Sequence, residues 1–140
     1  MAELALRQLE PSLQLGICFL ATVRKDGGPR LHPVGPYLID GTLYLIVNPT
    51  SPKRHDLARD RRYVLHTLPG PKDEEFRIEG LAVRISDEPR RARVKAALGH
   101  HLHDDDWLFE LDIQRALTTS WENWAQPNTR PIRRHWPTRP

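Results

Sequence analysis

The sequence predicts a mainly β fold, in which strands form a small antiparallel barrel and short helices lie between them. Short apolar segments rich in β-branched residues alternate with turn signals such as "RKDGGPR" (24–30) and "DG" (40–41), which favours hairpins. In "EEFRIEGLAVRIS" (74–86) the apolar alternation changes phase at Glu79 and Gly80, as it does at a β-bulge. Bulges curve sheets, so a barrel is favoured over a flat sandwich.

The first part of the chain predicts three strands. Residues 14–24, "LQLGICFLATV", are too short and too rich in apolar residues for a surface helix. In 30–39, Pro33 and Pro36 exclude a helix and indicate an edge or bulged strand. Residues 42–47 follow the second turn, so we expect two tight hairpins and a three-stranded antiparallel meander.

A short helix is predicted over residues 51–59, with Ser51 as its cap and Pro52 at its first position. Lys53 and Arg54 then fall in the first turn. The helix dipole and unpaired amide groups already present positive charge there, so acidic residues would be expected instead. The pattern indicates that an anion binds at the start of this helix.

The remaining elements are two strands and a longer helix. Residues 61–68 and 106–117 predict strands. Residues 87–101 predict a helix, because Pro89 can open it and Gly99 can end it. The expected apolar face of this helix consists of Val94, Ala97 and Leu98, and the expected inward face of the last strand of Trp107, Phe109, Leu111 and Ile113.

Composition limits the function classes. The 140 residues suit one domain, and a net charge of +3 permits an anionic partner without requiring one. Cys18 is the only cysteine, so an internal disulfide is excluded. No apolar run approaches the roughly 20 residues of a membrane helix, and the first residues lack a signal-peptide pattern. We therefore expect a cytoplasmic protein with no membrane partner.

Two further clusters carry polar or reactive groups. The run "HHLHDDD" (100–106) contains ligand types for zinc or iron, but contiguous residues after a helix end usually solvate a turn, so no metal is expected. No nucleophile constellation is present, and Cys18 lies within an apolar strand. Catalytic residues cannot be named, and covalent hydrolysis is not expected.

The residues after 117 form a basic, aromatic tail. Its end, "RPIRRHWPTRP", holds four arginines and no acid. Trp121, Trp124 and Trp136 need a surface to cover. The tail fits a nucleic-acid arm, a segment covering a cofactor, or a solvated terminus.

Three strings, in this order and spacing, resemble a known family: "FLATVRKDGGPRLHPV", "DGTLYLIVNPTSPKRHDLARDRRYVLH" and "EGLAVRIS". They are similar to the pyridoxamine 5'-phosphate oxidase-like, FMN-binding split-barrel proteins over roughly residues 10–115. The resemblance implies a single domain, 1–140, with a six-stranded antiparallel split β-barrel. It also implies a homodimer with each cofactor held between subunits, in which the tail, 118–140, packs on the partner.

The resemblance also implies the cofactor site. A phosphate would bind beside the predicted short helix, accept hydrogen bonds from the Thr50 and Ser51 hydroxyls, and be held by Lys53 and Arg54 as cations. The cofactor ring would lie along one strand and the end of the strand facing it, and Trp136 would reach the partner's cofactor. The ring-lining residues implied are Arg30, Leu31, His32, Pro33, Val34, Val47 and Asn48.

The function implied is an oxidoreductase that passes hydride or electrons to a small organic substrate. FMN is the default cofactor, and the deazaflavin coenzyme F-420 is the alternative because Arg54, Arg61 and Arg62 suit its longer anionic tail. Vitamin-B6 oxidation is not expected, because the chain is shorter than the true oxidases and its ending does not match theirs. A flavin or haem carrier or sensor without turnover stays open. A small nucleic-acid-binding barrel is the third hypothesis, against which the few basic-aromatic alternations count.

Overall fold

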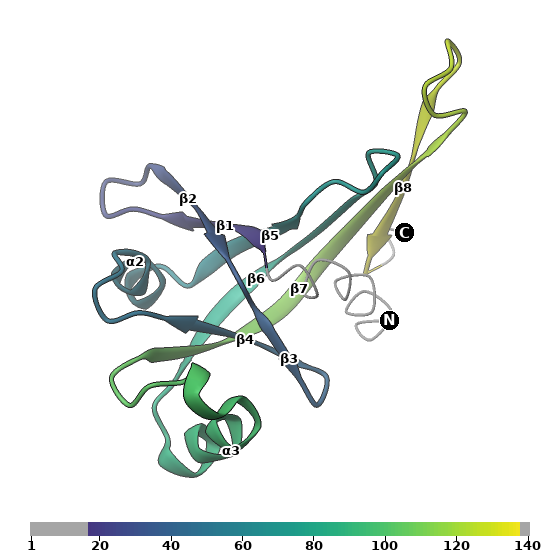
Figure 1. Cartoon of the computed structure of the whole chain (residues 1–140). Helices are drawn as coiled ribbons and strands as arrows, with labels where there is room; N and C mark the ends of the chain where they lie inside the picture. The colour runs from purple at the N-terminus through teal and green to yellow at the C-terminus, as the bar shows by residue number, and fades with distance from the viewer. Residues whose placement is uncertain (1–16, 138–140) are drawn as a thin grey trace.

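The computed structural model describes residues 17–137, which form a curled antiparallel sheet with two α-helices (Figure 1). No helix of this part of the chain is long and apolar enough to cross a membrane. In chain order the elements are β1 (Cys18–Val23), β2 (Pro29–Val34), β3 (Tyr37–Ile39), β4 (Thr42–Val47), α2 (Lys53–Arg59), β5 (Arg62–Thr67), β6 (Glu75–Ile85), α3 (Glu88–Leu98), the 3-10 turn η1 (Gly99–His101), β7 (Trp107–Glu122) and β8 (Arg130–Trp136).

The sheet is a split β-barrel, as the sequence predicted, but it has eight strands instead of six. Its order is β2-β1-β5-β6-β7-β4-β3, and β8 pairs with β7 outside this path. The two ends of this order, β2 and β3, are consecutive in the chain and are joined by residues 35–36 alone. Three Cα steps span at most ~11 Å, so the two edges must curl toward each other at this junction.

The two predicted hairpins are confirmed, but the three-stranded meander is wrong. β1 pairs with β2 and β3 with β4, and the second turn has left-handed backbone at Asp40 (φ 49°) and Gly41 (φ 76°). However, β4 pairs on its other side with β7 and not with β2. Pro33 and Pro36 have no backbone N–H group, so this segment cannot pair fully on both sides. This suits a segment that runs from one edge strand, β2, to the other, β3.

The bulge is present where the sequence placed it, but its extra residue belongs to the neighbouring strand. Glu79 is opposite Arg115, whereas Gly80 is opposite Ile113, so Gln114 in β7 has no partner in β6. The apolar Leu81 and Val83 therefore do not mark a change of phase in β6; they lie on its outward, partly exposed face.

Side chains of β6 keep a single inward alternation through the bulge. Phe76, Ile78 and Ala82 are all buried in the main core. Gly80 continues the same phase, and a Cβ there would lie 1.9 Å from the backbone oxygen of Asp112. Glycine is required because the two strands approach too closely for any side chain.

Helix α3 forms as predicted, with one difference on its apolar face. The Asp87 carboxylate caps its start by accepting from the amide three residues later (2.9 Å), and Gly99 ends it with φ 58°. Val94 is buried and Leu98 packs beside it, but Ala97 is exposed. Alanine has too little apolar surface to require burial, so the periodic pattern overestimated the face.

The tail contains a strand that the sequence pattern did not reveal. β7 continues to Glu122 and returns as β8, forming a hairpin arm that projects from the barrel (Figure 1). The indoles of Trp121 and Trp124 donate to the backbone oxygen and the carboxylate of Asp73, at 2.9 and 3.1 Å. Trp136, at the end of β8, packs against the core of its own chain.

The interior of the barrel is filled by side chains. The main cluster includes Leu20, Leu45, Leu65 and Phe109, all fully buried. A second cluster lies beneath α3, around Leu108. Any ligand must therefore bind at the rim or on the outside of the sheet.

Candidate functional site

The candidate site lies where edge strand β2 faces helix α2. Arg30 points toward α2, because its Nε lies 2.6 Å from a carboxylate oxygen of Asp56 on that helix. His32 shares the phase of Arg30 along β2, whereas Leu31 and Pro33 are exposed on the opposite face. The strand thus presents a guanidinium and an imidazole to the helix.

Asp56 anchors helix α2 to strands β1 and β2, and this role was not predicted from the sequence. Its carboxylate is 2% exposed and accepts hydrogen bonds from Thr22 Oγ1 (2.9 Å), Arg30 Nε (2.6 Å) and Arg59 Nη2 (3.1 Å). Burial alone would raise the pKa of Asp56, but the hydrogen bonds from Arg30 and Thr22 outweigh burial and hold it below the usual value. The group is an ionised structural anchor.

Lys53 is a half-buried cation with only a neutral partner. Its Nζ donates to Ser51 Oγ at 3.0 Å, and no ion pair of Lys53 occurs within residues 17–137. Burial lowers the pKa of Lys53 from its ordinary value. An ammonium group that is partly removed from water and not neutralised favours an anionic ligand.

His32 carries an unsatisfied buried atom at the same place. Its Nε2 has no hydrogen-bond partner among the described residues. Its pKa is lowered, first by burial and then by the positive charges of Lys53 and Arg30; Asp56 opposes this effect, and Arg24 adds to it. A buried polar atom without a partner is costly, so this nitrogen fits a ligand oxygen.

The turn before α2 is held by its own hydrogen bonds, which change the roles predicted for Thr50 and Ser51. Asn48 Oδ1 accepts from the Thr50 amide (2.9 Å) and the Thr50 hydroxyl (2.7 Å). Ser51 is not the helix cap: Pro52 occupies that position, and no side chain caps the helix. The Ser51 hydroxyl instead accepts from Lys53, which leaves its own proton available to a ligand.

The Arg54 guanidinium lies near an aromatic ring. Its Nε donates to His55 Nε2 at 3.1 Å, and its guanidinium lies 5.7 Å from the centre of the Trp107 ring. Arg84 covers the same ring at 3.5 Å. The two guanidinium groups interact with the electron-rich indole and form a positive surface next to the candidate site.

The remaining predicted residues lie at three different places. Val34 and Val47 are buried in the main core, and the exposed Asn48 belongs to the turn. Trp136 ends β8, a strand that lies across the molecule from α2 (Figure 1), so one chain does not bring it to this site. The predicted residues that gather around the start of α2 are Arg30, His32, Thr50, Ser51, Lys53 and Arg54.

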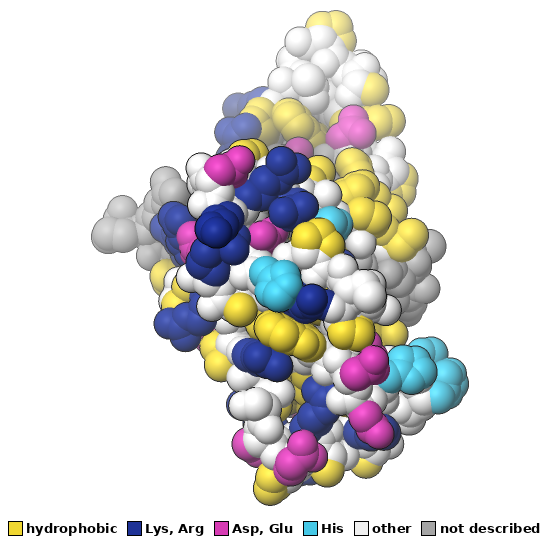
Figure 2. Space-filling model, turned by 90° about the vertical axis from the view of Figure 1, so that its left-hand side faces the viewer, with side chains coloured by type: hydrophobic (Ala, Val, Ile, Leu, Met, Phe, Trp, Pro, Cys, Tyr) yellow, Lys and Arg dark blue, Asp and Glu magenta, His cyan; other side chains and the backbone are white. Residues whose placement is uncertain are grey.

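The electrostatic character of this region is positive. Lys and Arg side chains gather on the face that carries α2 and the β1–β2 hairpin (Figure 2). The nearest carboxylate, Asp56, is already occupied by three donors. The arrangement can therefore bind and orient a phosphate.

A known protein family matches most of this chain. The model of the pyridoxamine 5'-phosphate oxidase family matches residues 6–125. The chain belongs to this family. No curated protein sequence matches it.

Solved structures similar to this family member share its fold at low sequence identity. The heme binding protein from Mycobacterium smegmatis has a TM-score of 0.65 and 22% identity over 94% of this chain, which spans 57% of that protein. A NimC/NimA family protein from Clostridium acetobutylicum has a TM-score of 0.64 and 17% identity, over 92% and 91% of the two chains. The heme storage protein HutZ from Vibrio cholerae has a TM-score of 0.63 and 13% identity, over 77% and 89%.

A phosphate group fits the site of this family member. Members of the family often bind flavins. The unpartnered His32 nitrogen, the Lys53 ammonium and the Ser51 hydroxyl are donors that suit phosphate oxygens. These groups can bind and orient, and none of them forms an activated nucleophile.

Among the described residues, Cys18 and the "HHLHDDD" run show no catalytic or metal-binding arrangement. Burial raises the pKa of the Cys18 thiol to about 11, so the thiolate is scarce near neutral pH. Within residues 17–137, no three histidine, cysteine or acidic side chains have metal-binding geometry. In the "HHLHDDD" run, Asp104 pairs with Lys95 at 2.6 Å and Asp106 caps the His103 amide at 2.9 Å.

Proposed function

We propose that this chain binds FMN, or the deazaflavin coenzyme F-420, and is an oxidoreductase acting on a small organic substrate. The observation that carries the proposal is the buried His32 Nε2 without a partner, next to the un-neutralised Lys53. Two such groups together are costly in an empty protein and favourable around a phosphate.

Each residue has a distinct part in holding the cofactor. Lys53 supplies the fixed positive charge, Ser51 donates its hydroxyl proton, and His32 donates from Nε2 in its protonated or suitable tautomeric form. Arg30 is held by Asp56 and keeps β2 and α2 at a fixed separation. The bound cofactor supplies the transfer of hydride or electrons, and the protein positions it and limits access of water.

The choice between the two cofactors depends on the surface beside the phosphate. Arg54 and Arg84 both lie near the Trp107 ring there and suit further negative charge. Arg62 is already paired with Asp60 at 2.6 Å, which removes part of the reason for favouring the longer anionic tail. FMN remains the first choice, and F-420 the second.

We also propose that the functional unit is a cytoplasmic homodimer. Large apolar side chains are exposed at one end of β1 and on β2, namely Ile17 (44%), Phe19 (37%) and Leu31 (66%). A contiguous apolar surface of this kind is typical of a subunit interface. A second copy would also complete a cofactor slot that a single chain leaves open on one side.

A haem carrier or sensor is the second candidate function. Two proteins of similar fold are, by name, a heme binding and a heme storage protein. The exposed His100 and His101, whose rings lie 4.1 Å apart, would be candidate iron ligands. This hypothesis requires no phosphate.

The deciding experiment is a cofactor titration of purified protein. We expect flavin fluorescence or absorbance to report saturable binding of FMN or F-420 by the unaltered chain. Lys53→Gln removes one charge-assisted contact, so affinity should fall roughly 10- to 100-fold. Arg93→Gln, on the exposed side of α3, is the matched control and should change nothing.

Three results would contradict the flavin proposal. One is an absence of FMN or F-420 binding at micromolar concentration, and another is an equal loss of affinity in the Arg93→Gln control. The third is a Soret band after haem addition that survives Lys53→Gln but is lost when His100 and His101 are replaced. That result would favour the carrier.

A further inference from the structure

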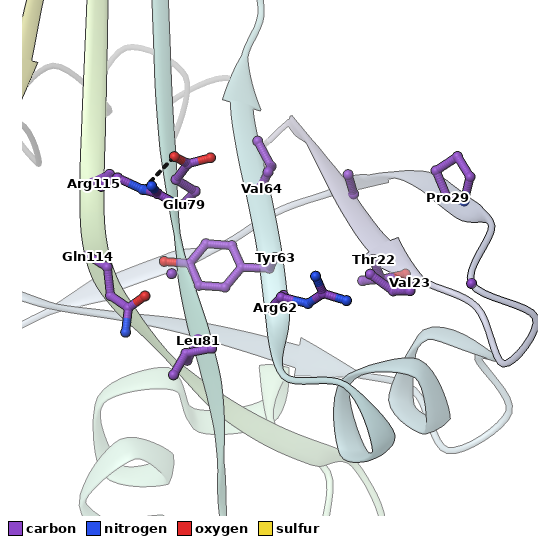
Figure 3. Close-up of a pocket in the computed structure, with 13 residues that line it drawn as sticks. Thr22, Val23, Pro29, Arg62, Tyr63, Val64, Glu79, Leu81, Gln114 and Arg115 are labelled. Atoms are coloured by element: carbon purple, nitrogen blue, oxygen red, sulfur yellow. Dashed lines mark ion pairs between the residues drawn. The ribbon is translucent and has the colours of Figure 1, made fainter.

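A groove of about 490 Å³ lies on the outer side of the sheet, over β1, β5, β6 and β7 (Figure 3). In β1, Ala21 and Val23 of the groove floor alternate with Thr22, whose hydroxyl bonds to Asp56 of α2. Neighbouring residues of a strand point to opposite faces of the sheet. The groove and the candidate phosphate site are therefore on opposite faces of β1. The apolar floor consists of Ala21, Val23, Val64 and Leu81.

The β-bulge shapes one wall of this groove. Gly80 contributes no side chain, and the unpaired Gln114 lies at the wall together with Arg115. Tyr63, opposite Gly80, is buried in the main core, and its hydroxyl donates to the backbone oxygen of Asp112 at 3.0 Å across the bulge (Figure 3). The irregularity in the strand pairing thus leaves a hollow at Gly80 that no side chain of its own fills.

Basic residues surround the apolar floor. Arg115 pairs with Glu79, the one acidic side chain of the lining, at 2.8 Å, and Arg62 pairs with the neighbouring Asp60 at 2.6 Å, so both carboxylates are neutralised. The hydrogen bonds from Arg62 lower the pKa of Asp60 to about 2, and this carboxylate stays ionised and paired.

A second hollow continues the groove toward the end of α2. The two share Val23, Gly27, Arg62 and Leu81. The lining of the second adds Arg24, Lys25, Arg59 and Arg61. In the part of the chain that the structure describes, Arg24, Lys25 and Arg61 make no ion pair. One end of the groove is apolar, and the other carries uncompensated positive charge.

We propose that this groove binds a small aromatic anion of the carboxylate class. Its ring lies on the flat apolar floor formed by Val64 and Leu81, and its carboxylate points toward Arg24 and Arg61. A sheet surface offers a flat contact that a planar ring covers well. Charge complementarity then selects an anion over a neutral ring. The site does not depend on the proposed flavin function, because none of the groups proposed to hold the phosphate, namely His32, Ser51 and Lys53, lines it.

The test uses the full chain labelled with ¹⁵N and two probes that differ only in charge. Titration with 2-naphthoate should shift the amide signals of Val64, Leu81 and Gln114 and reach saturation. The neutral 2-naphthamide should bind roughly tenfold more weakly, because it lacks the charge that two partly exposed arginines attract.

Paired variants separate the groove from the rest of the surface. Leu81→Gln should weaken 2-naphthoate binding, whereas Val83→Gln, two residues along the same face of β6, should not. The Arg24→Gln, Arg61→Gln double variant should remove most of the preference for the anion, and Arg93→Gln should keep it. The charge variants leave the apolar floor intact, so a folding defect of Leu81→Gln cannot decide the test.

Three results would overturn the proposal. The first is signal shifts around Ser51 to His55 that disappear in Lys53→Gln, which would place the probe in the phosphate site. The second is an absence of saturation at millimolar probe. The third is signal changes of Val64 and Leu81 on protein dilution alone, which would mean that a second copy of the chain covers the groove.

Discussion

At the scale of single residues, His32 should make anion binding depend on pH. The pKa of the empty-site imidazole lies below 6.5, because burial and the charges of Lys53 and Arg30 disfavour its protonation. A bound phosphate dianion places negative charge beside His32 and raises the pKa of its imidazole, so binding takes up a proton. Affinity should therefore be greatest at low pH and fall, by at most about tenfold per pH unit, as pH rises through the raised pKa.

This dependence can be measured by isothermal titration calorimetry of FMN. Buffers of different ionisation enthalpy report the number of protons taken up. The range above pH ~7 is suitable, because the phosphate monoester has a second pKa of about 6 and is then fully ionised. His32→Gln keeps a hydrogen-bond donor but cannot titrate, so its affinity should be independent of pH in this range. Equal proton uptake by both proteins would refute the role of His32.

The same lowered pKa predicts the acid stability of the cofactor-free protein. In the unfolded chain His32 binds a proton at its ordinary pKa of 6.5, whereas in the folded chain it does so only at lower pH. The unfolded state thus binds more protons between these two values, and stability falls as pH decreases through 6.5. Thermal melts from pH 5 to 8 should show this decrease, and His32→Gln should reduce it.

Asp56 should contribute more to stability than other carboxylates around α2. Asp56→Asn removes the charge that pairs with Arg30 and Arg59, and we expect a loss of about 1–3 kcal/mol in the free energy of unfolding. Urea denaturation measures the change. Asp60→Asn is the control, since that carboxylate pairs with Arg62 at the solvent-exposed end of the helix and should matter little.

At the scale of elements, the features that depend on nearby residues could be predicted from the sequence. Asp40 and Gly41 specify their hairpin because left-handed backbone is needed locally, and Gly80 indicated the bulge. The pairing order was not predictable, since it depends on which distant edges meet. The arm of β7 and β8 was missed because it is largely exposed and lacks an apolar face.

The candidate site shows the same limit. Lys53 was identified from its unusual place in a helix start, a local signal. Asp56 was missed because its partners Thr22 and Arg30 lie 34 and 26 residues away, and only the folded chain brings them together. The one local indication that Asp56 faces inward was its position next to the apolar Leu57, which is buried in the structure.

The bulge between β6 and β7 should tolerate no side chain at position 80. Gly80→Ala would place a Cβ at 1.9 Å from the Asp112 backbone oxygen, and neither strand can move aside without losing hydrogen bonds. We expect a loss of at least about 2–3 kcal/mol in the free energy of unfolding, as for other overpacked interiors. Chemical denaturation provides the measurement.

A matched glycine variant shows whether that loss is specific to the bulge. In Gly28→Ala the nearest atom to the new Cβ is Asp26 Oδ1 at 3.0 Å, part of a mobile side chain in a turn. This variant should lose much less stability. If both variants unfold at the same denaturant concentration, the close approach at Gly80 is not what requires glycine.

At the scale of the whole molecule, the exposed apolar surface at Ile17, Phe19 and Leu31 is the feature that a single chain leaves unexplained. It borders the proposed groove, because Leu31 is opposite Ala21 of the groove floor, whereas the basic residues Arg24 and Arg61 lie beyond the Val23 end. A second copy that covers this surface therefore reaches the Ala21 end of the groove and leaves its basic end open. The two proposed surfaces are neighbours on one sheet face.

The dimer proposal is tested by Leu31→Asp, which places a charge in the middle of the proposed interface. The unaltered chain should have about twice its 16.2 kDa mass in light scattering after gel filtration, and the variant should be a monomer, because burying an unpaired carboxylate is strongly unfavourable. The Leu31 side chain faces away from His32 and Lys53. Loss of FMN affinity in a folded Leu31→Asp monomer would therefore mean that the partner completes the cofactor slot, whereas retained affinity would mean that one chain holds the phosphate by itself. Arg93→Asp adds the same charge on α3 and should leave both mass and affinity unchanged.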